Sequence, residues 1–256
     1  MVRKEAGAII RQLGKYPVEL TMTTNGIRLG EFAADLQAAG MCSVNISLDT
    51  LQADKFLLLT KRDQFQKVYD NILLMAARGM RVKVNVVAMK GVNDEEITQF
   101  IALTKALPLH IRFIEFMPFT GNHWDHAKVI GLQEILDIVA QDYSFEPIKH
   151  KKHDTAKNFQ VNGHAGTFAV ISTMTTPFCG DCNRMRLTAD GKMKNCLFSK
   201  TETDLLGALR RGEDLEPLIR ACIAAKAAER GGQFTDDYTH TDPLSLQNRS
   251  MIAIGG

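Results

Sequence analysis

The chain has 256 residues, 45% of them hydrophobic and 23% charged, which is enough to bury one sizeable core or a core with a small appended domain. A formal net charge of +2 does not by itself predict a nucleic-acid polymer or a membrane as partner, and no apolar stretch is as long as a membrane helix or the core of a signal peptide. Five cysteines, with three of them clustered, do not form a disulfide framework. These features predict a globular cytoplasmic protein with reduced thiols.

Apolar runs that end in polar residues predict four β-strands in the first half of the chain, within 18–26, 43–49, 82–89 and 111–117. Helix-like segments lie between them, over 29–39, 65–78 and 94–106. Gly40 and Gly79 end the first two segments, and Asn93 is a candidate N-cap for the third. Strands that alternate with helices predict βα units, a parallel sheet and an α/β fold.

Four polar or charged residues, Lys83, Asn85, Arg112 and Glu115, interrupt the third and fourth predicted strands. A charged group inside a parallel strand costs several kcal/mol unless it is paired or faces a ligand cavity. A structural ion pair of Glu115 with Lys83 or Arg112 is one interpretation. Because all four are expected on one face, we favour a binding site, with Thr23 and Ser47 at the ends of the first two strands.

After Pro118 the pattern changes, so we predict a first domain over 1–118 and a smaller second region over 119–256. A short helix is expected over 132–140, a hairpin from 159–161 and 167–171, and further helices within 204–230.

The stretch FCGDCNRMRLTADGKMKNCLFS, residues 178–199, contains Cys179, Cys182 and Cys196. A closed structural zinc site needs four ligands, whereas three leave one position open for water or a substrate. Zinc held by the three thiols and a histidine such as His164 remains an alternative. The isolated Cys42 and Cys222 are expected to be small buried hydrophobes.

Several motifs are similar to those of the GTP 3',8-cyclases, radical S-adenosylmethionine enzymes that begin molybdenum cofactor biosynthesis. The resemblance covers essentially the whole chain: TTNG at 23–26, NISLDT at 45–50, VKVNVVAMKGVND at 82–94, IRFIEFMPF at 111–119, CxxCxRxRL from 179, CLF at 196–198 and the terminal IGG. It implies an incomplete TIM-type (β/α)6 barrel that lacks its first strands, followed by a small C-terminal α+β region with an iron–sulfur cluster.

The resemblance also implies residue roles. Cys179, Cys182 and Cys196 match the ligands of a second 4Fe-4S cluster, whose open iron binds the purine of GTP. Arg184 and Arg186 match positions that face the triphosphate, and Thr23 and Lys83 match further GTP contacts. Ser47 and Met117 match positions around S-adenosylmethionine. Gly255 and Gly256 match a glycine tail that enters the active site.

For the intact enzyme, the family reaction removes hydrogen from C3' of GTP and joins C3' to C8 of guanine, giving (8S)-3',8-cyclo-7,8-dihydroguanosine 5'-triphosphate. An electron donor, cyclic pyranopterin monophosphate synthase as the downstream enzyme and a homodimer are the implied partners.

Two family motifs do not occur in the sequence: the CxxxCxxC loop of the cluster that cleaves S-adenosylmethionine, and the GGEP strand that holds its methionine end. Residues 1–5 resemble those that follow GGEP in the family, so Met1 is expected to match an internal position of the full-length family sequence. We therefore expect a fragment that cannot generate the 5'-deoxyadenosyl radical. A GTP-binding protein without turnover is a further alternative.

Overall fold

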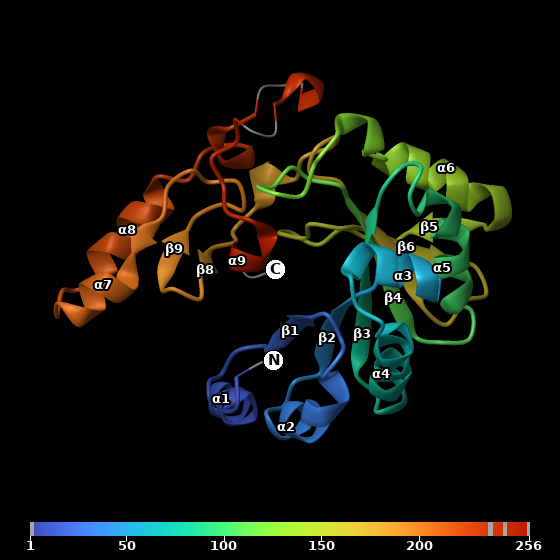
Figure 1. Cartoon of the computed structure of the whole chain (residues 1–256), viewed down its shortest axis with the longest axis horizontal. Helices are drawn as coiled ribbons and strands as arrows, with labels where there is room; N and C mark the ends of the chain where they lie inside the picture. The colour runs from blue at the N-terminus through green and yellow to red at the C-terminus, as the bar shows by residue number, and fades with distance from the viewer. Residues whose placement is uncertain (1–2, 235–237, 243–244, 255–256) are drawn as a thin grey trace. The chain divides into compact units, whose positions relative to one another are not determined.

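The computed structural model describes residues 3–234, 238–242 and 245–254 (Figure 1). The chain divides into two compact units. The first, here called the sheet unit, comprises Met1–Ile114, Leu132–His150 and Ala156–Ile171. The second, the cysteine unit, comprises Glu115–Gly131, Lys151–Thr155 and Ser172–Gly256.

A seven-stranded sheet with the order β1-β2-β3-β4-β7-β6-β5 forms the centre of the sheet unit. Its strands are β1 (Thr21–Thr24), β2 (Ser43–Ser47), β3 (Arg81–Ala88), β4 (Leu109–Glu115), β5 (Phe145–Pro147), β6 (Lys157–Val161) and β7 (Thr167–Ile171). The pairs β1–β2, β2–β3 and β4–β7 are parallel, whereas β5 and β6 add an antiparallel edge. The α/β fold with a mostly parallel sheet is therefore confirmed; a partial barrel remains a prediction.

The helices of this unit are α1 (Ala6–Leu13), α2 (Ala33–Ala38), α3 (Ala53–Thr60), α4 (Phe65–Ala77), α5 (Ile97–Leu103) and α6 (Leu132–Asp142), with 3-10 turns η1 (Leu29–Phe32) and η2 (Asp94–Glu96). In Figure 1, α4, α5 and α6 lie on the same side of the sheet. Strand β3 alternates between buried valines and more exposed polar residues, as its pattern requires. Strand β3 thus has one apolar face and one polar face, whereas β7 is buried on both.

The predicted strands, the hairpin of β6 and β7 and the three helical segments are confirmed, whereas α1 and α3 were not predicted. Gly40 and Gly79 end their helices with φ of 69° and 74°, conformations that favour glycine. Asn93 precedes η2 as expected, but its side chain does not cap the helix. Its amide instead bonds to the backbone of Asp49, Val87 and Met89, and so joins the ends of β2 and β3.

The cysteine unit is built around a small antiparallel sheet of β8 (Arg186–Leu187), β9 (Lys192–Lys194) and β10 (Thr203–Asp204). Its helices are α7 (Leu205–Arg210), α8 (Glu216–Ala224) and α9 (Met251–Ile254), with 3-10 turns η3 (His126–Lys128), η4 (Cys179–Asp181), η5 (Arg230–Gly232) and η6 (Tyr238–His240). Phe119, Met174, Phe198 and Ile254 form an apolar cluster in its interior.

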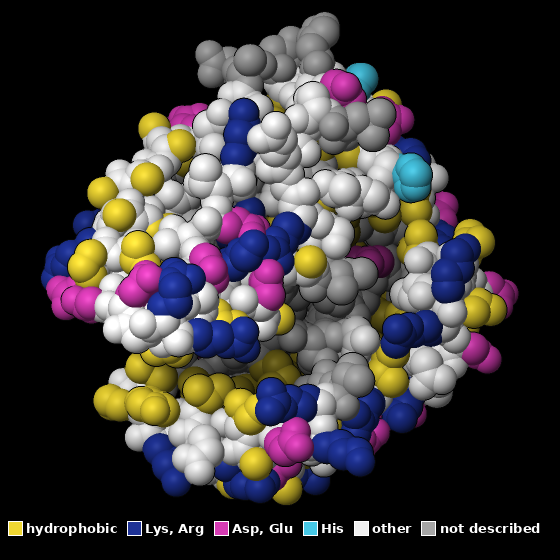
Figure 2. Space-filling view, turned by 60° about the vertical axis from the view of Figure 1, so that its left-hand side comes forward, with side chains coloured by type: hydrophobic (Ala, Val, Ile, Leu, Met, Phe, Trp, Pro, Cys, Tyr) yellow, Lys and Arg dark blue, Asp and Glu magenta, His cyan; other side chains and the backbone are white. Residues whose placement is uncertain are grey.

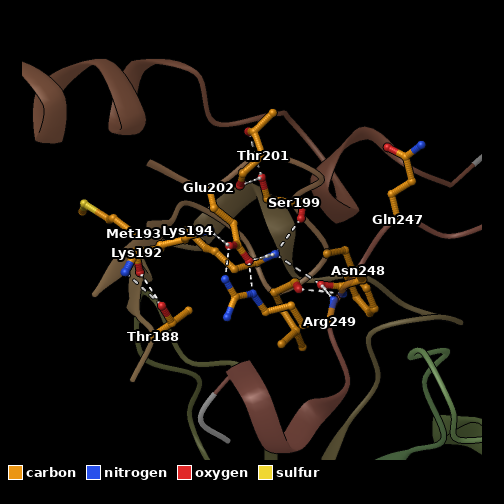
Figure 3. Close-up of polar contacts among 12 residues, drawn as sticks. Thr188, Lys192, Met193, Lys194, Ser199, Thr201, Glu202, Gln247, Asn248 and Arg249 are labelled. Carbon is orange, nitrogen blue, oxygen red and sulfur yellow. Dashed lines mark hydrogen bonds and ion pairs between the residues drawn. The ribbon is translucent and has the colours of Figure 1, made fainter. Parts of the chain in front are cut away.

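A charged network fastens the C-terminal segment to this small sheet (Figure 3). The guanidinium of Arg249 donates two hydrogen bonds of 2.9 Å to Asp190 and also binds Glu202. The ammonium group of Lys194, only 1% exposed, donates to the carbonyl oxygen of Ser199 at 2.7 Å and to Asn248 at 3.2 Å. Hydrogen bonds and ion pairs therefore hold the C-terminal segment against the small sheet.

The compact units do not follow the sequence boundary at residue 118. Strand β7 pairs with β4, and β6 and β5 extend the same sheet, so residues up to 171 return to the sheet unit. A functional division at residue 118 remains a prediction.

The surface carries both signs of charge. On the face shown in Figure 2, basic and acidic side chains are interspersed, in agreement with the net charge of +2. None of the helices in the described part of the chain combines the length and apolar character that a membrane crossing requires.

Candidate functional site

The three clustered cysteines line one cavity of the cysteine unit. Its empty space is about 470 Å³, part of it open to solvent. Cys179 lies in the turn η4, Cys182 just after it, and Cys196 follows β9. The tight turn and the β8–β9 ribbon thus bring together thiols that are up to 17 positions apart in the sequence.

Hydrogen-bond donors surround two of the sulfur atoms. The backbone N–H of Arg230 donates to Cys179 Sγ at 3.4 Å, and the guanidinium of Arg184 donates to Cys182 Sγ at 3.4 Å. The ammonium group of Lys226 lies 3.7 Å from Cys182 Sγ. Burial raises the pKa of the Cys179 thiol. For Cys182, burial acts in the same direction, but the N–H and charge of Arg184 and the charge of Lys226 outweigh it and lower the pKa.

The donor set suits an iron–sulfur cluster. Thiolates are its usual ligands, and N–H donors to sulfur are a common feature of such sites. No group of three or more His, Cys, Asp or Glu side chains among the described residues converges closely enough to hold a single metal ion. His164, considered as a zinc ligand, bonds through Nδ1 to Thr104 Oγ1 at 2.8 Å in the sheet unit.

Arg184 and Arg186 line the same cavity, as the alternation of an extended segment predicts. The guanidinium of Arg184 lies 4.8 Å from the ring centre of Phe178, a cation–π contact that fixes its direction. Arg186 belongs to β8, opposite Lys194. Burial, with the charge of Arg184, lowers the pKa of Arg186. Arg186 is therefore partly dehydrated, whereas Arg184 lies exposed at the edge of the cavity.

A second group of predicted residues lies on the polar face of the sheet unit. Thr23, Asn45 and Lys83 occupy neighbouring positions across β1, β2 and β3. The amide of Asn45 donates to Thr23 Oγ1 at 3.2 Å and accepts from Arg112 Nη1 at 3.2 Å. This row crosses the third residue of β1, the centre of β2 and the amino-terminal half of β3, so it lies within the sheet and not beyond the carboxyl ends of the strands, where parallel sheets usually bind ligands.

Ser47 ends β2, is exposed and lies opposite Asn85 of β3. The side-chain oxygen of Asn85 is buried and has no hydrogen-bond partner among the described residues. A buried acceptor without a donor is costly, which supports a ligand contact at this position.

The expectation that Glu115 shares this face is wrong. Burial alternates along β4 so that Glu115 is buried with Phe113 and not grouped with Arg112. Its carboxylate accepts from the backbone N–H groups of Met174 and Thr175, at 2.7 and 3.2 Å, and from the Thr175 hydroxyl. Burial raises its pKa. Glu115 organises a turn of the cysteine unit.

The remaining predicted residues have different outcomes. Met117 is half-buried and packs against the cluster of Phe119 and Phe198 in the cysteine unit. Gly255 and Gly256 lie outside the described residues. Cys222 is buried as predicted, but Cys42 is exposed, which corrects its assignment as a buried hydrophobe. Cys42 directly precedes β2, and Arg81 Nη2 donates a hydrogen bond to its Sγ at 3.1 Å.

Sequence reasoning missed Asn45, Lys226 and Arg230 as site residues. Asn45 stands in the NISLDT motif, next to polar residues on both neighbouring strands, and that alternation could have identified it. Lys226 and Arg230 lie more than 29 positions beyond Cys196, and no local pattern connects them to the cavity.

Two family models match the chain: the Radical SAM superfamily over residues 1–104, and Molybdenum Cofactor Synthesis C over residues 109–232. GTP 3',8-cyclase of Moorella thermoacetica is 37% identical over 263 aligned positions, which cover 100% of this chain and 79% of that protein. The chain belongs to the GTP 3',8-cyclase family. All three clustered cysteines fall in the second matched region.

Other members of the family are similar over less of their length. The mitochondrial GTP 3',8-cyclase of Arabidopsis thaliana is 41% identical over all of this chain and 65% of its own length. Molybdenum cofactor biosynthesis protein 1 of Mus musculus is 41% identical over 91% of this chain, which spans only 36% of that protein. Among solved structures, a domain of pyruvate-formate lyase-activating enzyme from Bacteroides vulgatus matches 53% of this chain and 83% of its own, with a TM-score of 0.42 and 14% identity, too distant to carry an argument.

Proposed function

We propose that the chain carries the substrate-binding part of a GTP 3',8-cyclase, which converts GTP to (8S)-3',8-cyclo-7,8-dihydroguanosine 5'-triphosphate at the start of molybdenum cofactor biosynthesis. The observation that carries the proposal is the cavity that Cys179, Cys182, Cys196, Arg184 and Arg186 line together. Soft thiolates suit an iron–sulfur cluster, and guanidinium groups suit a triphosphate.

On this proposal the three cysteines hold a 4Fe-4S cluster, which supplies an open iron to a ring nitrogen of guanine. The protein's own part is to bind and orient GTP and to exclude water. Arg184 and Arg186 bind phosphate oxygens, and the contact of Arg184 with Phe178 limits the rotamers that must be frozen when GTP binds.

Thr23 and Lys83 of the sheet unit contact GTP. Ser47 of the sheet unit and Met117 of the cysteine unit belong to the S-adenosylmethionine site. The row through Asn45 supports a ligand role for Thr23, because the amide of Asn45 fixes the direction of its hydroxyl. Gly255 and Gly256 are the tail residues that enter the active site. An electron donor, cyclic pyranopterin monophosphate synthase and a second copy of the chain are the proposed partners.

Radical generation needs a second cluster, and these 256 residues contain no CxxxCxxC loop to hold one. We therefore propose that this chain of 256 residues binds GTP and one cluster without turnover. A structural zinc module is the competing function.

Anaerobic reconstitution with iron and sulfide tests the metal assignment. We expect about four irons and four sulfides per chain, by the ligand count of one cluster. Zinc as the bound metal, with no sulfide, would reject the cluster and favour the structural module.

Binding measurements on the reconstituted chain test the arginines. Arg184→Ala and Arg186→Ala should each weaken GTP binding by roughly 1.5–3 kcal/mol, the range for hydrogen bonds to charged groups, with iron content unchanged. Guanosine serves as the control ligand, because it lacks phosphate. An equal loss of GTP and guanosine affinity would show that neither guanidinium binds phosphate.

A further inference from the structure

Lys226 connects the two segments that carry Cys182 and Cys196. It lies just after helix α8 and is partly buried. Its ammonium group donates to the carbonyl oxygen of Asn195, directly before Cys196, at 2.6 Å. It also donates to the carbonyl oxygen of Arg184, two residues after Cys182, at 3.0 Å. One side chain therefore holds together two cysteine segments that lie 14 positions apart in the sequence.

Helix α8 holds Lys226 in this place. Cys222 lies four residues before Lys226, on the same side of the helix, and is buried. The side-chain amide of Asn195, itself only 5% exposed, donates to the carbonyl oxygen of Cys222 at 2.9 Å. Asn195 thus donates to the helix through its side chain and accepts from Lys226 through its backbone. The approach of Lys226 to the cysteine segments is part of the packing of the helix.

The ammonium group also lies 3.7 Å from Cys182 Sγ. Two of its three acceptors are carbonyl oxygens and the third is this sulfur atom, so none of them is a carboxylate that would cancel its charge. Lys226 is not one of the residues that line the cavity, so its charge stays beside Cys182 whether or not a ligand fills that space. A cation at this distance stabilises negative charge on the sulfur.

We propose that Lys226 is a positioning residue of the three-cysteine site, which holds the Cys182 and Cys196 segments together and whose charge raises the reduction potential of the 4Fe-4S cluster bound there. An electron that enters the cluster adds negative charge near the ammonium group, so the cation favours the reduced state. The inference rests on the metal assignment of the proposed function and extends it. In the rival role, Lys226 only ties two backbone segments together.

Lys226→Met tests the role of the charge, because it keeps an apolar stem but removes the ammonium group. After anaerobic reconstitution, a redox titration followed by electron paramagnetic resonance measures the midpoint potential, and a chelator challenge measures the rate of iron loss. At a fixed potential we expect the ratio of reduced to oxidised cluster to fall about fivefold, from the attraction of unit charges about 4 Å apart in water. Iron should also be lost faster. Lys226→Arg, which keeps the charge and the donors, should recover most of both properties.

Lys200→Met is the matched control. Lys200 is exposed, lies four residues after Cys196 and does not line the cavity. Its replacement removes one positive charge from the same unit without touching the contacts of Lys226. We expect the potential and the iron retention of this variant to equal those of the wild type.

The potential separates the two roles. A wild-type potential in Lys226→Met overturns the inference even if iron is lost faster, because a simple tie affects retention and not potential. An equal shift in Lys200→Met also overturns it, since net charge would then explain the shift. If Lys226→Met takes up no cluster, the same comparison is made in Lys226→Gln, which is uncharged but can still donate to a carbonyl oxygen. If neither uncharged variant takes up a cluster, loading of Lys226→Arg supports the inference and its failure to load overturns it.

The proposed function can fail separately. If the wild-type chain takes up zinc without sulfide, the proposed function and this inference fail together. If the wild-type chain holds the cluster but binds no GTP, the substrate assignment fails, while the potentials of the Lys226 variants still decide this inference.

Discussion

The sheet unit has a large apolar interior and buries the carboxylate of Glu96 only as a pair with Lys55, whereas in the cysteine unit charged groups are buried beside a small apolar cluster. Phe100 and Phe113, both completely buried, pack edge to face under the helices with ring centres 6.4 Å apart. In the cysteine unit, Lys194 and Arg230 are at most 5% exposed, and the thiols and arginines surround a cavity. The first interior is mainly packed side chains, and the second surrounds a cavity for which a ligand has been proposed.

This difference has a consequence for cofactor dependence. All the cysteines except Cys42 belong to the cysteine unit. We therefore expect metal binding and nucleotide affinity to depend on that unit, and the bulk of hydrophobic stabilisation to come from the sheet unit.

The largest effect is all or none. With GTP, S-adenosylmethionine and dithionite, the chain as given should release no 5'-deoxyadenosine above a control without protein. Reductive cleavage needs an iron that chelates the methionine end, and beyond the three cavity thiols the chain has only Cys42 and Cys222, each isolated in sequence. Chromatographic detection of 5'-deoxyadenosine above the control would show that the chain is catalytically complete.

Next is Cys196→Ser, which should lose the bound cluster and GTP affinity together, because the metal is part of the proposed nucleotide site. Cys222→Ala is the matched control: Cys222 belongs to the same unit and is buried, but it does not line the cavity. Iron and sulfide analysis with a GTP titration measures both variants. Full iron content in Cys196→Ser would remove that residue from the ligand set.

Phe113→Ala should lower the free energy of unfolding by about 3–5 kcal/mol, the usual cost of deleting a buried aromatic side chain. Phe113→Leu, which leaves a smaller void, should cost less. Urea unfolding followed by circular dichroism measures the change. The iron content of the folded variants should equal that of the wild type, and a selective loss of iron would contradict the division between the two units.

Arg249→Met should have a smaller effect, a fall in melting temperature of about 2–4 °C, because ion pairs that stay partly open to solvent contribute modestly. Arg249 lowers the pKa of Asp190, and it also lowers the pKa of Glu202 against the opposing effect of burial. A carboxyl group whose pKa is lower in the folded than in the unfolded state stabilises the fold at pH values above its unfolded-state pKa. This stabilisation is lost as the pH falls toward the folded-state pKa. The wild type should therefore lose its advantage over the variant below about pH 4.5, and a constant difference down to pH 3 would contradict the role of the network.

A pH-dependent effect concerns His110, whose pKa is lowered to about 4 by burial, with the charges of Arg112 and Lys83. Between pH 6.5 and 4 the folded state then binds fewer protons than the unfolded state. The free energy of unfolding should therefore decrease as the pH is lowered through this window, by at most about 1.4 kcal/mol per pH unit. His110→Asn can keep a hydrogen bond to Thr167 and should flatten this slope in urea titrations at pH 7, 6 and 5. If the free energy of unfolding of the variant depended equally steeply on pH, a group other than His110 would take up the proton.

The sequence by itself determined the alternation of strands and helices, because apolar periodicity and glycine stops are local signals. It also determined the three-cysteine segment with its two arginines, since spacing within an extended stretch fixes which side chains share a direction. The motif resemblance added the family, which the comparisons confirm.

The tertiary structure alone decided the features that depend on distant pairing. Strand β7 joins β4, so residues beyond 118 complete the sheet, and no local signal encodes that hydrogen-bonded partner. Glu115 follows the strand pattern of a site residue but is buried in a turn with Met174 and Thr175. Arg230 reaches the cavity only because a left-handed turn packs against Phe198. Local patterns fix which way a side chain points along its own segment, but long-range packing decides what it meets there.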